Sequence, residues 1–121
     1  MKKEEKKLKN DNFIDSFTNA FSGILQAIKT QKNIKIQIVI GILVIIAGFI
    51  CKLEVSEFIW LTFTIFSVLF AEMINTAVEA AVDLCTQEYH PLAKIAKDVA
   101  AGAVLLMSIN AVVIGCLIFL F

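Results

Sequence analysis

The sequence predicts an all-α integral membrane protein, with three transmembrane helices preceded by an N-terminal amphipathic surface helix. The first observation behind this prediction is composition: 59% of the 121 residues are hydrophobic, which is too apolar for an ordinary soluble domain. The second is pattern, because three long apolar runs alternate with short polar connectors. So short a chain fits one domain, and we assign residues 1–121 to a single membrane domain.

The first expected helix is amphipathic and covers residues 12–30. Before it, residues 1–11 are a lysine-rich charged run, which predicts a disordered basic tail. Suitable N-cap residues stand at Asn10, Asp11 and Asn12. The apolar residues that follow recur at helical spacing, with polar residues on the opposite face: Phe13, Ile14, Phe17, Phe21, Ile24, Leu25 and Ile28. This pattern favours a helix on the membrane surface; a helix packed on a protein core is the alternative.

Three segments are expected to cross the membrane, namely residues 34–51, 58–84 and 95–121. The first reaches the roughly 20 residues of a span only by including Ile34 and Ile36, while the Lys35 side chain extends to the interface. Pro91 suits the first turn of the last helix. Asn110 is a lone polar residue in the third span, and we expect its amide to bond to another helix.

The distribution of lysine predicts the orientation. The chain has no arginine, and most of its lysines precede residue 36. By the positive-inside rule the N-terminus is cytoplasmic, and with three spans the connector at residues 85–97 is cytoplasmic too. The formal net charge is zero, so nothing predicts a nucleic-acid partner. Cys51, Cys85 and Cys116 lack metal-type spacing and are expected to be buried free thiols.

A polar stripe interrupts the second span and is formed by Glu72, Asn75, Glu79 and Asp83. At about 100° per helical residue, the three acids fall within roughly 40° of one another, and Asn75 lies on the same flank. Carboxylates at membrane depth are costly and by default mark a functional site. Asp83 alone would fit the point where the helix leaves the membrane. Four polar groups aligned over about three turns favour a functional role.

Lys97 and Asp98 open the third span on the same side of the membrane. A lysine at the start of a helix opposes the macrodipole, which argues against a purely structural role for Lys97. Phosphoryl transfer from Mg-ATP to a membrane alcohol uses acids, a metal site and a lysine, but the residues alone predict only a membrane site for a cation and an anion. The sequence has no glycine-rich phosphate loop and no catalytic loop of soluble kinases. A proton or ion carrier fits the stripe nearly as well.

Two motifs resemble the prokaryotic diacylglycerol kinase family. They are E-x-x-N-T-A-x-E-x-x-x-D at residues 72–83 and H-P-L-A-K-x-A-K-D-x-A-A-G-A-V at residues 90–104. Within the family, the chain is most similar to the undecaprenol kinases of Gram-positive bacteria, over nearly its whole length. The resemblance implies a lipid kinase of the bacterial cell membrane. It also implies ATP and Mg²⁺ as cofactors, and a homotrimer with active sites at protomer boundaries.

Roles for individual residues follow from the same resemblance. Glu72 would be the general base that deprotonates the lipid hydroxyl, and Glu79 the Mg²⁺ ligand. Asn75 and Asp83 would support the site. The residues implied in nucleotide binding are Asn19, Glu88, Tyr89, His90, Lys97 and Asp98.

Gln31 departs from the family pattern, which usually has a glutamate at this position within Thr-Glu-Arg-Asn. A glutamine still offers a carbonyl oxygen to a metal, but it brings no charge. Weaker Mg²⁺ binding, a changed metal preference and a catalytically impaired relative are the alternatives this residue raises. Undecaprenol is the favoured acceptor and diacylglycerol the second. From a different functional class, the alternative is a non-enzymatic membrane protein, such as an ion carrier or an inactive assembly subunit.

Overall fold

The computed structural model describes residues 12–121, which fold into four α-helices. These are α2 (Phe13–Thr30), α3 (Lys32–Ile50), α4 (Val55–Cys85) and α5 (Pro91–Leu120). The last three are each long and apolar enough to cross a membrane. The all-α class with three candidate membrane-spanning helices is therefore confirmed. The predicted basic tail at residues 1–11 lies outside the described residues.

Side-chain caps explain where three of the helices begin. At α2, the Asp15 N–H donates to the Asn12 carboxamide oxygen at 2.8 Å. At α4, Glu54 and Glu57 form a reciprocal capping box. At α5, His90 is the N-cap and is followed by proline at the first helical position. Because of these caps, α4 and α5 start several residues before the apolar runs expected to span.

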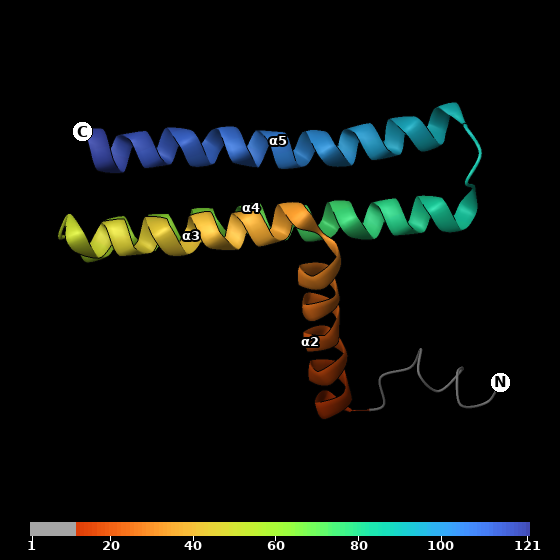
Figure 1. Ribbon diagram of the computed structural model, residues 1–121, viewed down its shortest axis with the longest axis horizontal. Helices are drawn as coiled ribbons and strands as arrows, with labels where there is room; N and C mark the ends of the chain where they lie inside the picture. The colour runs from red at the N-terminus through yellow and green to blue at the C-terminus, as the bar shows by residue number, and fades with distance from the viewer. Residues whose placement is uncertain (1–11) are drawn as a thin grey trace.

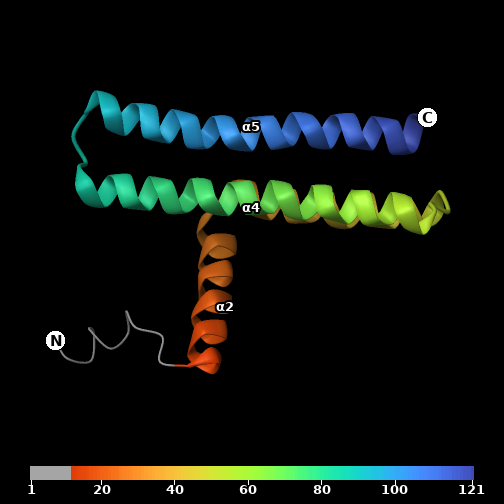
Figure 2. The same ribbon diagram turned by 180° about the vertical axis from the view of Figure 1, so that it is seen from behind.

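The long helices run side by side, and α2 leaves them crosswise (Figure 1). Figure 2 shows from behind that α5 lies along α4 for nearly its whole length. α3, with 19 residues, is about 28 Å long and close to a bilayer core in thickness. α4, with 31 residues, is about 46 Å long. The later part of α4 and the start of α5 therefore continue beyond the level at which α2 leaves α3.

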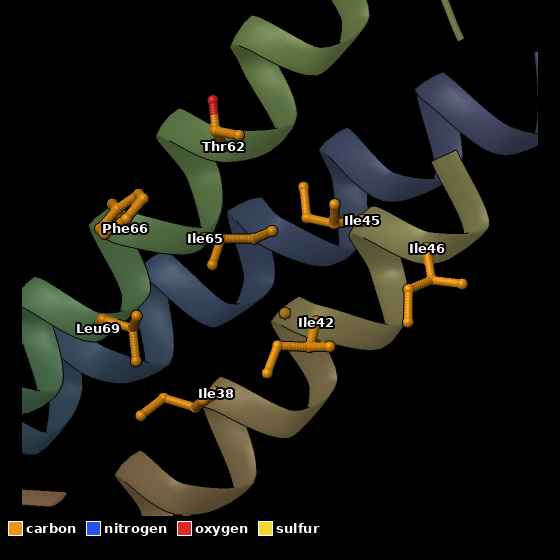
Figure 3. A pocket seen from close by; sticks show the side chains of 9 residues that line it. Ile38, Ile42, Ile45, Ile46, Thr62, Ile65, Phe66 and Leu69 are labelled. Atoms are coloured by element: carbon orange, nitrogen blue, oxygen red, sulfur yellow. The ribbon is translucent and has the colours of Figure 1, made fainter. Parts of the chain in front are cut away.

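The packing between the helices is thin. The buried apolar side chains lie on α2, α3 and α4, and are Ala27, Ile34, Leu61, Val68 and Ala71. No residue of α5 is buried. Between α3 and α4, apolar side chains line an open crevice of about 290 Å³ (Figure 3). A single chain therefore exposes most of its apolar surface, as a lipid-facing protein does.

The expectation for the cysteines is wrong in one respect. All three thiols are free, as expected, but each is exposed on this chain rather than buried. An apolar sequence environment indicates burial in a soluble protein. In a membrane helix, apolar neighbours in the sequence are equally typical of a surface that faces lipid or another subunit.

Two glycines allow α3 to approach α4 closely. A methyl group added at Gly41 would lie 2.9 Å from the Ile65 side chain. One added at Gly48 would lie 2.9 Å from the Phe58 ring and 3.1 Å from the Leu53 side chain. The turn that follows α3 depends on the same close approach, because the Leu53 N–H donates to the Gly48 carbonyl at 3.1 Å.

We predict that Gly48→Ala destabilises the fold by about 1–3 kcal/mol, because the added methyl overpacks a rigid ring. Thermal unfolding in detergent, followed by circular dichroism, measures the effect. Gly23→Ala is the matched control, since nothing lies within 4 Å of a methyl group there. Equal midpoint temperatures of unfolding for Gly48→Ala and Gly23→Ala would show that α3 and α4 do not pack as described.

Candidate functional site

An ion pair joins the ends of α4 and α5. The Lys97 ammonium donates to an Asp83 carboxylate oxygen at 2.7 Å, across 14 positions of sequence. Both side chains are well exposed, at 40% for Lys97 and 53% for Asp83. Exposed pairs of this kind contribute about 1 kcal/mol or less to stability. The pair is therefore too weak to explain by itself why charges gather at this end of the hairpin.

A polar pocket of about 260 Å³ surrounds this ion pair. It lies where the end of α4, the connector and the start of α5 meet, and it contains six of the residues predicted from the sequence: Asp83, Glu88, Tyr89, His90, Lys97 and Asp98. Lysines, carboxylates and an aromatic ring in one small pocket suit a polar ligand that carries negative charge.

Lys94 also lines this pocket, although the predicted site did not include it. Its ammonium is paired with Asp98, one helical turn away, at 2.5 Å. The spacing of Lys94 and Asp98 in the sequence is a signal that could have identified it. Both lysines of the pocket are therefore held by carboxylates, which orient their ammonium groups before any ligand binds.

The connector between α4 and α5 is fixed by its own side chains. The Thr86 hydroxyl accepts a hydrogen bond from the Glu88 N–H at 3.2 Å and donates to the Glu88 carbonyl at 3.3 Å. The Leu92 N–H donates to His90 Nδ1 at 3.1 Å. Because Nδ1 accepts, the proton of the neutral imidazole lies on Nε2, which is then a donor.

The polar stripe on α4 runs from a buried end to an exposed end. Glu72 is only 4% exposed. Asn75 is half-buried, and its carboxamide oxygen is buried without a hydrogen-bond partner. Glu79 is half-buried and interacts electrostatically with both Glu72 and Lys97. The stripe thus links a buried carboxylate to the charges of the pocket.

Five predicted residues do not line this pocket. Glu72, Asn75 and Glu79 lie earlier on α4, and the other two lie outside that helix. Asn19 lies on α2 and Gln31 at the α2–α3 junction, and neither lines the pocket around Lys97. α2 instead contacts both α3 and α4. Within residues 12–121, no group of three or more His, Cys, Asp or Glu side chains converges as a ready-made metal site. A metal here would need ligands from elsewhere, such as phosphate oxygens.

Residues 18–119 match the family model described as prokaryotic diacylglycerol kinase. The chain is 39% identical to an undecaprenol kinase of Bacillus subtilis, over 91% of this chain and 89% of that protein. It is 46% identical to a diacylglycerol kinase of Synechocystis, over 88% of this chain and 62% of that longer protein. A diacylglycerol kinase of Escherichia coli matches at 37% identity over 64% of this chain.

Proposed function

Because this chain belongs to the prokaryotic diacylglycerol kinase family, we propose that it is an ATP-dependent lipid kinase whose acceptor is undecaprenol. One structural observation carries the proposal. A single helix, α4, leads from a buried carboxylate, Glu72, to a lysine-lined pocket that contains Asp83. The acceptor is proposed from the undecaprenol kinase that the chain matches over nearly its full length.

In the proposed reaction, the nucleotide occupies the pocket, with Lys97 and Lys94 facing its phosphates. Tyr89 and His90 contact the nucleoside end, and the Nε2–H of His90 donates a hydrogen bond. The lipid hydroxyl oxygen bonds to the γ-phosphorus as the bond from that phosphorus to the ADP oxygen breaks. Glu72 accepts the hydroxyl proton. Asn19 would reach the nucleotide from α2 only if the ligand extends beyond the pocket.

The residues present also fit a bound Mg²⁺ ion. Mg²⁺ typically takes one or two carboxylates and completes its shell with water and phosphate oxygens. Glu79 supplies such a carboxylate, and the unpaired Asn75 oxygen lies one turn before it on α4. Gln31 offers a neutral carbonyl oxygen from the α2–α3 junction. When bound, Mg²⁺ would offset the negative charge of the phosphates.

The proposed position in the membrane follows from the helix lengths. α3 is long enough for one crossing, so α2, which leaves its N-terminal end crosswise, would lie on a membrane surface. Most lysines precede residue 36, which favours the cytoplasmic side of a bacterial cell membrane by the positive-inside rule. The exposed phenylalanines Phe13, Phe17 and Phe21 suit insertion into that surface. The later part of α4 then projects into water, where ATP is available, and the N-terminus is cytoplasmic.

The decisive experiment measures transfer of labelled phosphate from ATP to lipid by the purified protein in mixed micelles. Undecaprenol and diacylglycerol are offered in parallel, with matched detergent and Mg²⁺. Faster turnover of undecaprenol supports the proposal, and faster turnover of diacylglycerol selects the second acceptor. If neither lipid is phosphorylated, the protein is an impaired relative or a non-enzymatic membrane protein.

We predict that Glu72→Gln lowers kcat by at least about 100-fold, because it removes the proton acceptor. MgATP binding, measured by titration, should stay near the wild-type value, since the pocket is further along α4. Glu57→Gln is the matched control: it makes the same change on the same helix, and glutamine can still complete the capping box. Near-wild-type kcat in Glu72→Gln would reject the general-base role.

We predict that Gln31→Glu lowers the Mg²⁺ concentration that gives half-maximal activity, because it adds a charge to a metal ligand. One additional charged ligand should lower that concentration several-fold, which corresponds to a gain of about 1 kcal/mol or more in the binding free energy of Mg²⁺. The same titration on Gln26→Glu, on the exposed surface of α2, controls for a general effect of charge. Identical Mg²⁺ curves for Gln31→Glu and wild type would place residue 31 away from the metal.

We further propose that the working protein is a homotrimer. The family resemblance supplies the number three, and this chain supplies the need for partners. No residue of α5 is buried, and the polar side chain of Asn110 is exposed midway along its apolar part. An amide facing lipid is unfavourable, and a hydrogen bond to a neighbouring helix would satisfy it.

A trimer predicts a native mass of three times the 13.4 kDa chain in detergent and in bilayers. Asn110→Leu should weaken association by about 1 kcal/mol, seen as more monomer when the protein is diluted in detergent. Ile109→Leu changes the exposed neighbouring residue and should leave the oligomer intact. If the protein is a monomer in both detergent and bilayers, the proposed homotrimer is wrong.

A further inference from the structure

The connector at residues 86–90 is short and largely exposed, yet it is bonded at both ends. Thr86 is its only half-buried residue, and the other four are exposed. The Thr86 hydroxyl closes on the backbone of Glu88, and His90 Nδ1 accepts from the Leu92 N–H. Glu88, which is bonded to Thr86, and Tyr89, which follows it, both line the polar pocket.

We propose that Thr86 is a positioning residue for nucleotide binding, which fixes the connector so that Glu88, Tyr89 and His90 face the pocket before the nucleotide arrives. The inference rests on the proposed kinase function. An exposed segment with little packing samples many conformations, and ordering it on binding lowers affinity. The Thr86 hydroxyl accepts one hydrogen bond from the Glu88 N–H and donates another to the Glu88 carbonyl. These two bonds restrict the backbone of Glu88 before the nucleotide binds.

Thr86 itself lines the pocket, so the bonds that its donors already make favour positioning over direct contact with the ligand. A threonine hydroxyl has one proton, and here the Glu88 carbonyl accepts it at 3.3 Å. The hydroxyl therefore has no proton left to donate to a phosphate oxygen. The Thr86 N–H is also used, because it donates to the Val82 carbonyl at 2.9 Å and ends α4. Both donors of Thr86 thus serve the shape of the connector.

Three variants test the proposal. Thr86→Val keeps the side-chain shape and removes the hydroxyl, whereas Thr86→Ser keeps the hydroxyl. Thr62→Val is the control, because the Thr62 hydroxyl donates only to carbonyls of its own helix, those of Phe58 and Ile59. For Thr86→Val we expect KM for MgATP to rise about three- to ten-fold with kcat within about two-fold of wild type, because only ligand binding is weakened. Thr86→Ser and Thr62→Val should match wild type in both constants.

Hydrogen exchange without nucleotide gives a readout that does not depend on activity. The Glu88 amide should exchange faster in Thr86→Val than in wild type, because it loses its acceptor. An unchanged KM in active Thr86→Val overturns the proposal. A raised KM for MgATP in Thr86→Val with unchanged exchange of the Glu88 amide also overturns the proposal, because that result means that Thr86 contacts the nucleotide directly. If the wild-type protein phosphorylates no lipid, the proposed function fails, and equilibrium titration with MgATP still decides whether Thr86→Val weakens binding.

Discussion

The structure depends on one constraint, the cost of placing carboxylates in a chain that is otherwise built for lipid. An acidic side chain at the centre of a bilayer costs about 3 kcal/mol on insertion scales. Three acids on one helix face would make a simple span unfavourable. The chain meets this constraint by making α4 much longer than α3 and by carrying Glu79 and Asp83 in the last two turns of α4. Glu72, the acid nearest the apolar half, is covered by protein instead.

The charges at this end of α4 and α5 are paired although such pairs add little stability. Lys97 with Asp83 and Lys94 with Asp98 bring opposite charges together at exposed positions. Pairing also holds the ammonium groups in place. In the proposed kinase, an arriving phosphate would replace a carboxylate as the partner of a lysine without a large rearrangement.

Much of the fold could be predicted from the sequence because apolar length and helix caps are local signals. Asn12 and Pro91 mark helix starts that can be recognised without a structure. The capping box of Glu54 and Glu57 was not predicted, and α4 therefore begins three residues before the expected residue 58. The pairing of Lys97 with Asp83 could not be read this way, because it depends on how α5 is aligned along α4. Nor could the bonds of Thr86, since they depend on the backbone of the connector. Burial of the cysteines was predicted wrongly because apolarity here indicates lipid exposure.

In the proposed kinase, the stripe on α4 would let one helix serve two substrates that come from different solvents. A lipid hydroxyl stays at the membrane interface, and a nucleotide stays in water. Their reacting atoms can meet only where a scaffold crosses the interface and carries a proton acceptor at its covered end and an anion pocket at its wet end. Glu72 and the Lys97 pocket occupy these two ends of the later part of α4, with Glu79 between them. In the proposed kinase, the position of a residue along α4 therefore determines which substrate it can reach.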